Sequence, residues 1–138
     1  MTPPKAIHLF LLLVVLICLN GCVRLGTTVT SEIISPDNKW DAVLMVRNGG
    51  AMTDFSTQIS VINKAGTFAK QGALWTAGNI FIADDDHGKI PVDGNGQINV
   101  KIVWASASKL IVSCPGKARV FKQEPTFQSV TIGYEKLQ

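Results

Sequence analysis

The chain has 138 residues, enough for one domain, and its formal net charge is only +3. Its basic residues are scattered along the sequence, which argues against a nucleic-acid-binding surface. Hydrophobic residues make up 46% of the chain, and many of them lie near its start. The rest has the composition of an ordinary globular domain, not of a membrane-spanning or disordered protein.

The first 21 residues have the pattern of a bacterial export signal. Lys5 gives a positively charged start, and an apolar run follows from Leu9 to Leu19. This run is shorter than the roughly 20 residues that a membrane-spanning helix needs, and it has the length of a signal-peptide core. We therefore expect residues 1–21 to be a signal-peptide helix that is removed from the mature protein.

The sequence Leu19-Asn20-Gly21-Cys22 resembles the lipobox of bacterial lipoproteins. In that family the peptidase cuts after a small residue, and the thiol of the following cysteine carries a diacylglycerol as a thioether. The resemblance implies that the mature protein begins at Cys22 and is held to a membrane by its acyl chains. The alternative is an uncleaved signal anchor.

The residue after the lipidated cysteine bears on which membrane holds the protein. Asp at this position commonly retains lipoproteins at the inner membrane of Gram-negative cells, and this chain has Val23 instead. The resemblance thus favours the outer membrane, facing the periplasm, in such a cell. We expect residues 22–30 to be the lipidated tether and residues 31–138 to be a single domain.

Period-two alternation predicts that the domain is built from strands. Apolar and polar residues alternate in the windows 40–46, 55–61, 98–104, 109–112 and 127–134, and shorter candidates are 29–34, 80–83 and 118–121. Turn sequences such as those at 35–38 and 93–96 separate them. We expect an all-β fold, a small antiparallel β-sandwich or flattened barrel of about seven or eight strands, with Trp40, Phe55 and Trp104 in its core.

Part of the mature chain resembles an uncharacterised family of small bacterial proteins, a domain of unknown function. The matching residues are Ser35-Pro36-Asp37, Lys39, Arg47, Gly50-Ala51, Thr53, Phe55 and Thr57-Gln58-Ile59-Ser60. Gly49 stands where that family often has a cysteine, so no redox role is carried over at this point. The resemblance implies a small β-domain and no known activity.

The segment around residues 48–58 is the candidate binding loop. It is longer than a simple hairpin turn needs, and long loops in compact domains are more often functional than idle. Its glycines allow close backbone approach, and its donors and acceptors suit a polar ligand. The candidate residues are Arg47, Gly49, Gly50, Thr53, Asp54, Thr57 and Gln58. The alternative is a structural hairpin loop, closed by a pair between Arg47 and Asp54.

Chemistry beyond binding has little support. The run Asp84-Asp85-Asp86-His87, with Asp93 and Asn95 nearby, has ligands that suit a cation, but it lacks the rest of a calcium-loop motif. The alternative is a solvated acidic loop, and we predict no metal. In the mature chain His87 is the one histidine, and Cys114 is the one cysteine besides Cys22. No motif pairs a nucleophile with a base, so we expect that the protein is not an enzyme and binds no cofactor. We expect Cys114 to be a packing residue in the core, with a reactive thiol as the alternative.

The leading functional interpretation is therefore a lipid-anchored binding module of the cell envelope. Its partners would be the membrane, through Cys22, and an unknown protein or envelope ligand. We expect sheet edges and loops opposite the tether to carry the binding. The alternative is an envelope accessory or immunity-type protein that counters a toxin, and an enzyme is the least favoured of the three.

Overall fold

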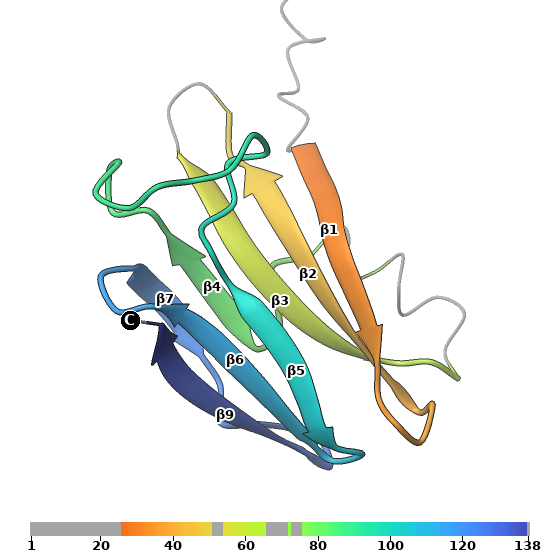
Figure 1. Cartoon of the computed structure of the whole chain (residues 1–138). Helices are drawn as coiled ribbons and strands as arrows, with labels where there is room; N and C mark the ends of the chain where they lie inside the picture. Colours follow the sequence, from red (N-terminus) through yellow and green to blue (C-terminus); the bar gives the residue numbers. More distant parts are fainter. Residues whose placement is uncertain (1–25, 51–53, 66–71, 73–75, 138) are drawn as a thin grey trace, which may run out of the picture.

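The computed structural model describes residues 26–50, 54–65, 72 and 76–137, and nine β-strands run through them (Figure 1). The strands are β1 (Gly26–Ile34), β2 (Trp40–Asn48), β3 (Phe55–Asn63), β4 (Phe81–Asp84), β5 (Lys101–Ser106), β6 (Lys109–Pro115), β7 (Arg119–Gln123), β8 (Thr126–Phe127) and β9 (Val130–Leu137). The all-β prediction is confirmed. The predicted signal-peptide helix at 1–21 lies outside the described residues.

The strands form two sheets that pack face to face as a β-sandwich. One sheet has five strands in the order β1-β2-β3-β4-β7, and the other has four in the order β5-β6-β9-β8. Every strand pair is antiparallel except β6 and β9. The predicted antiparallel β-sandwich is confirmed, with this one parallel pair as the exception among the described strands. Between β6 and β9 the chain crosses to the other sheet as β7, so it can return in the same direction as β6.

One hydrophobic core fills the space between the two sheets. Its largest contributors include Trp40 from β2, Phe81 from β4 and Trp104 from β5. Trp40 is 6% exposed and Trp104 is 9% exposed, which confirms both as core residues. The indole N–H of Trp104 also donates to the Ile33 carbonyl over 2.8 Å, and this hydrogen bond joins the edge strands β5 and β1.

Phe55 does not belong to this core, and the prediction that it would is wrong. It is the first residue of β3 and is 44% exposed. Its ring lies against Gly96, in the turn that follows Asp93, where an added Cβ would approach the ring to 2.4 Å. Gly96 has a φ of 81°, a left-handed conformation that favours glycine. Phe55 therefore covers a turn at the end of the sandwich.

Strands β7 and β8 are two parts of one extended run that passes from one sheet to the other at Glu124 and Pro125. The Glu124 N–H donates to the Ile80 carbonyl, and the Pro125 carbonyl accepts from the Ile132 N–H. The Tyr134 hydroxyl donates to the carbonyls of Ile80 and Glu124, at 2.9 and 2.8 Å. Burial raises the pKa of this hydroxyl well above its ordinary value, so it remains a donor.

The final predicted strand, at 127–134, is divided in two. Gln128 has a φ of 51°, and this left-handed residue makes a tight turn between β8 and β9. Val130 and Ile132 then enter the core. The division explains why nine strands are present where about seven or eight were expected.

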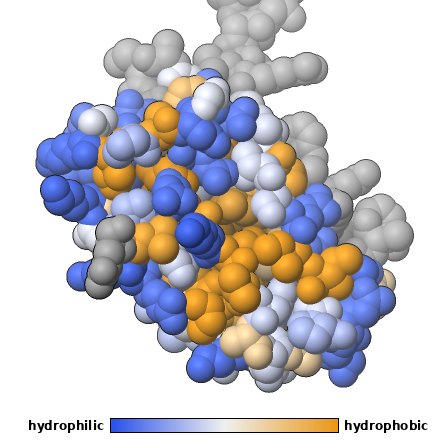
Figure 2. All heavy atoms as spheres, in the orientation of Figure 1, coloured by the Kyte–Doolittle hydropathy of each residue, from blue (hydrophilic) through white to orange (hydrophobic). Residues whose placement is uncertain are grey.

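The outer faces of the two sheets differ. On the five-stranded sheet, Val43, Met45 and Ile62 are buried and form a second small cluster. On the four-stranded sheet, Val103 is 59% exposed and Ala105 is also exposed. Figure 2 shows apolar atoms gathered over β5 and β6 on that side. The outer face of the five-stranded sheet therefore carries apolar side chains that are buried, whereas the outer face of the four-stranded sheet exposes apolar side chains to solvent.

We predict that Trp104→Ala will lower the free energy of unfolding by about 3–5 kcal/mol, because it removes a buried ring and the hydrogen bond to Ile33. The matched control is Phe121→Ala, because Phe121 is 59% exposed on β7. Its loss should lower the free energy of unfolding by less than about 1 kcal/mol. Urea unfolding followed by far-UV circular dichroism measures both. Equal effects of the two substitutions would contradict the core position of Trp104.

Candidate functional site

Three connections between strands, β2–β3, β4–β5 and β6–β7, meet the sheets at one end of the sandwich, which we call the loop end. The register places Gly26 opposite Asn48, Asn48 opposite Phe55 and Asp84 opposite Arg119. The antiparallel five-stranded sheet therefore starts β1, β3 and β7 and finishes β2 and β4 at this end. The loop end comprises the start of β1, the described residues 48–50 and 54 between β2 and β3, the connection 85–100 and the turn 116–118 (Figure 1).

The chain enters the sandwich at the loop end, and this changes two expectations. Strand β1 begins at Gly26, so residues 26–30 of the expected tether 22–30 belong to the sheet. The candidate binding loop after Asn48 lies beside this entry point, because Asn48 is the register partner of Gly26. The candidate binding loop therefore begins at the end of the sandwich where the chain enters, and not at the opposite end. Antiparallel pairing of β1 with β2 is the physical reason.

A buried carboxylate anchors the middle of the loop end. Asp84 is 5% exposed at the end of β4, and the Arg119 guanidinium pairs with both of its oxygens. The Asp86 N–H donates to the same carboxylate over 2.9 Å. Burial is the largest single influence on Asp84 and opposes its ionisation. The hydrogen bonds from Arg119 and Asp86 together outweigh it, so the pKa of Asp84 lies below its ordinary value.

His87 connects this pair to the candidate binding loop. Its Nε2 lies 2.8 Å from Arg119 Nη1, and its Nδ1 lies 3.3 Å from a carboxylate oxygen of Asp54. Because the guanidinium can only donate, Nε2 accepts in this arrangement and Nδ1–H faces Asp54. Asp86 and His87 both have left-handed φ angles, 51° and 60°. The chain Asp84–Arg119–His87–Asp54 thus joins three separate segments, and we call it the loop-end ion chain.

At the cation site considered at residues 84–87, two of the three carboxylates are engaged by basic side chains. The Arg119 guanidinium forms an ion pair with Asp84, and the Lys89 ammonium donates to the Asp86 carboxylate over 2.6 Å. The hydrogen bond from Lys89 is also the main reason that the pKa of Asp86 is lowered. Within the described ranges, no three His, Cys, Asp or Glu side chains come together to hold a metal ion. The alternative of a solvated acidic loop also fails for Asp84, which is buried.

The polar residues at the start of the candidate loop contact the chain's own backbone. Arg47 Nη2 donates to the Thr76 carbonyl, and the Asn48 side chain accepts from the Gly50 N–H over 2.9 Å. Gly50 has a φ of 96°, which the turn requires. Gly49 is half-buried beside it, and Thr53 lies outside the described residues. Asp54, the proposed partner of Arg47, contacts His87.

Thr57 and Gln58 were predicted as part of the binding surface, and the structure places both inside. Thr57 is 1% exposed, and its hydroxyl accepts from the Ile98 N–H over 3.1 Å. Gln58 is 5% exposed, and its carbonyl oxygen accepts from the Gly78 N–H over 2.8 Å. Gly78 approaches so closely that an added Cβ would lie 2.7 Å from a backbone oxygen. Both side chains hold neighbouring segments to β3 and are removed from the candidate surface.

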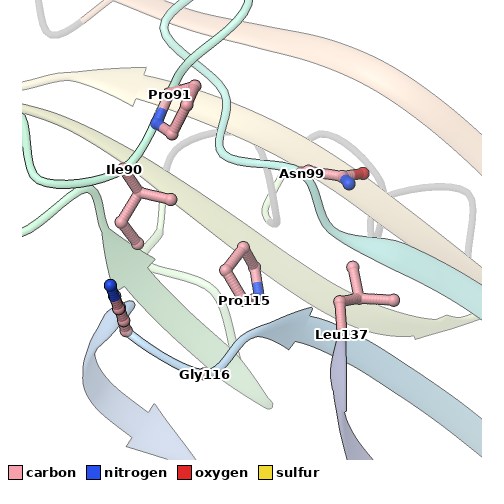
Figure 3. Close-up of a pocket in the computed structure, with 7 residues that line it drawn as sticks. Ile90, Pro91, Asn99, Pro115, Gly116 and Leu137 are labelled. Carbon is pink, nitrogen blue, oxygen red and sulfur yellow. The ribbon is translucent and has the colours of Figure 1, made fainter.

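The loop end also carries a pocket of about 390 Å³ that the sequence did not reveal (Figure 3). Ile90 and Pro91 lie on one side of it, and Pro115, at the end of β6, and Leu137, at the end of β9, lie on the other. Its remaining lining residues are Asn99, Gly116 and Lys117. These residues come from three separate parts of the sequence, so no local motif marks the pocket.

Cys114 is confirmed as a packing residue. It is a free cysteine, 7% exposed and part of the core between the sheets. Burial raises the pKa of its thiol, which keeps it protonated and unreactive.

Comparison of the chain with protein-family models, with curated proteins and with solved structures gave no match. Among the residues that the structure describes, no helix has the length and apolar character needed to cross a membrane.

We predict that Arg119→Met will destabilise the protein at neutral pH, because it leaves the buried Asp84 carboxylate without its partner. In the native chain the lowered pKa of Asp84 contributes stability above the unfolded-state value of about 3.9, and this contribution is lost as pH falls through the lower folded-state pKa. The variant lacks that contribution. Its deficit in melting temperature should therefore be largest near pH 7 and should shrink as the pH approaches 3.

The control for this experiment is Lys89→Ala, which removes the partner of the more exposed Asp86. Exposed pairs contribute little, so its melting temperature should stay close to that of the native chain. An Arg119→Met deficit that does not change with pH would contradict the assignment to Asp84.

Proposed function

We propose that the mature protein is a lipoprotein of the bacterial cell envelope, anchored through lipid on Cys22, with a β-sandwich that acts as a binding module. We assign it to the outer membrane, on the periplasmic side, if the cell is Gram-negative. The export signal and the lipobox at 19–22 support the anchor. The lipobox at 19–22 is the observation that carries the proposal, and the start of β1 at Gly26, only four residues after Cys22, determines which end of the sandwich the anchor holds.

The four residues from Cys22 to Gly26 set an upper limit on the distance between the lipid anchor and the domain. Four residues span at most about 14 Å when fully extended. Because β1 starts at the loop end, that end is held close to the bilayer surface. The opposite end, with the turns at Ser35–Lys39 and Ser106–Ser108, then points away from the membrane. We infer that the loop end contacts the lipid or other molecules at the membrane surface.

The chemistry of the loop end favours binding over catalysis. Both ring nitrogens of His87 are engaged, by Arg119 and by Asp54, and Cys114 is buried in the core. In the described part of the chain, neither group forms a nucleophile–base pair. What the loop end offers instead is a partly exposed guanidinium, an exposed imidazole and an apolar pocket.

We predict that Cys22→Ala will release the protein from the membrane fraction and abolish incorporation of radiolabelled palmitate, because it removes the only thiol at the lipobox. Cys18→Ala is the matched control, since Cys18 lies within the leader. It should leave both membrane association and labelling unchanged. The anchor proposal fails if Cys22→Ala is still recovered with membranes and still labelled.

A second experiment tests the orientation of the sandwich. Asn95→Cys places a thiol at the loop end and Ser108→Cys places one at the opposite end, both at exposed positions. Each lipidated variant is labelled with an environment-sensitive fluorophore and reconstituted into vesicles that contain headgroup nitroxide lipid. We expect strong quenching at residue 95 and weak quenching at residue 108. Equal quenching, or the reverse order, would contradict a membrane-facing loop end.

A further inference from the structure

We propose that the pocket between the connection 85–100 and the ends of β6 and β9 binds one acyl chain of an anionic membrane phospholipid. The inference rests on the proposed anchoring for the location of the pocket, and on the described side chains for its chemistry. Its volume of about 390 Å³ lies at the lower end of the range for pockets that hold small molecules.

The walls of the pocket are apolar on two opposing sides. Ile90 and Pro91 come from the connection after β4, and Pro115 and Leu137 come from neighbouring strands of the other sheet (Figure 3). The two prolines have no N–H, so they add apolar surface without a backbone donor that needs a partner. Such walls favour a hydrocarbon chain over a sugar or a charged peptide.

One cation lies among the residues that line this apolar space. Among the seven described residues that line the pocket, Lys117 alone carries a charge, and Asn99 supplies an amide. Lys117 is exposed in the turn between β6 and β7. A lysine in this setting lays its methylene groups along apolar surface and keeps its ammonium in water. An occupant with a hydrocarbon tail and an anionic head matches this lining, because the tail packs on the apolar walls and the head pairs with the Lys117 ammonium.

The position of the pocket indicates that its occupant comes from the membrane. The pocket lies at the loop end, where residues 116–118 and the connection 85–100 meet. The chain enters β1 at the same end, four residues after Cys22. The anchor therefore holds the pocket beside a bilayer, where phospholipid is the most abundant amphiphile. An acyl chain that enters the pocket places its phosphate near Lys117.

Photocrosslinking tests this assignment. Full-length lipidated protein is reconstituted into vesicles of phosphatidylethanolamine and phosphatidylglycerol, in which the phosphatidylglycerol carries a diazirine on one acyl chain. After irradiation, the labelled peptides are identified by mass spectrometry. We expect labels on peptides that contain Ile90, Pro115 or Leu137. A parallel sample with diazirine palmitate, free in solution, distinguishes a fatty acid from a membrane phospholipid.

Two pairs of variants separate pocket binding from mere closeness to the membrane. Lys117→Glu reverses the charge at the pocket, and Lys109→Glu makes the same change at the far end of β6. Leu137→Asn adds polarity to the pocket wall, and Val103→Asn does so on the exposed outer face of β5. We expect labelling to fall by roughly tenfold, equivalent to about 1.4 kcal/mol, in the two pocket variants only. Thermal unfolding of each variant confirms that it is folded.

Several outcomes would overturn the proposal. Equal labelling of all four variants would mean that proximity alone causes it, and labels confined to other peptides would place the lipid elsewhere. Labelling by palmitate but not by phosphatidylglycerol would assign the pocket to a free fatty acid. Failure here leaves the fractionation result for Cys22→Ala unchanged. If instead the anchor proposal fails, soluble palmitate still reports whether the pocket accepts an acyl chain.

Discussion

The two-sheet arrangement depends on the passage of the chain from one sheet to the other at Glu124 and Pro125, and the Tyr134 hydroxyl stabilises this passage. The hydroxyl contacts the carbonyls of Ile80 and Glu124 where one extended run leaves the five-stranded sheet and joins the four-stranded one. Without that passage β9 could not enter beside β6, and the two inner faces would not share one core. Pairing of β7, the first part of this run, with β4 brings Arg119 next to Asp84. The ion chain at the loop end is therefore a product of sheet topology.

The alternation of apolar and polar residues was sufficient to predict the strands, because burial on one face of a sheet has a period of two. Windows containing Trp40, Ile59, Trp104 and Val112 all became core strands. Which strands pair with one another is harder to predict from the sequence, since pairing depends on contacts between residues that are distant along the chain. Nothing local to β6 or β9 indicates that they run parallel, and the left-handed residue Gln128 has no glycine or proline to mark the turn.

The sequence marked a loop that lies at the loop end, but two of the residues predicted for its surface are buried. Length and glycine content marked the loop after Asn48, and the structure brings Asp54 from it to His87. Thr57 and Gln58 were expected on the surface, yet hydroxyl and amide groups also satisfy buried backbone, and here they do so. Arg119 was missed because it lies 35 residues from Asp84, and charge pairs at that separation leave no pattern in the sequence.

The place of β9 between β6 and β8 sets an order of assembly for the chain. As the chain is synthesised from its N-terminus, β1, β2 and β3 can pair as successive hairpins. Of the four-stranded sheet, only β5 and β6 can pair early, and the gap beside β6 stays open until residues 130–137 have emerged. Loop closure before a non-local pairing slows folding. Until β9 is in place the apolar inner faces of the two sheets stay open to solvent, so the core closes only when the last strand of the chain is available.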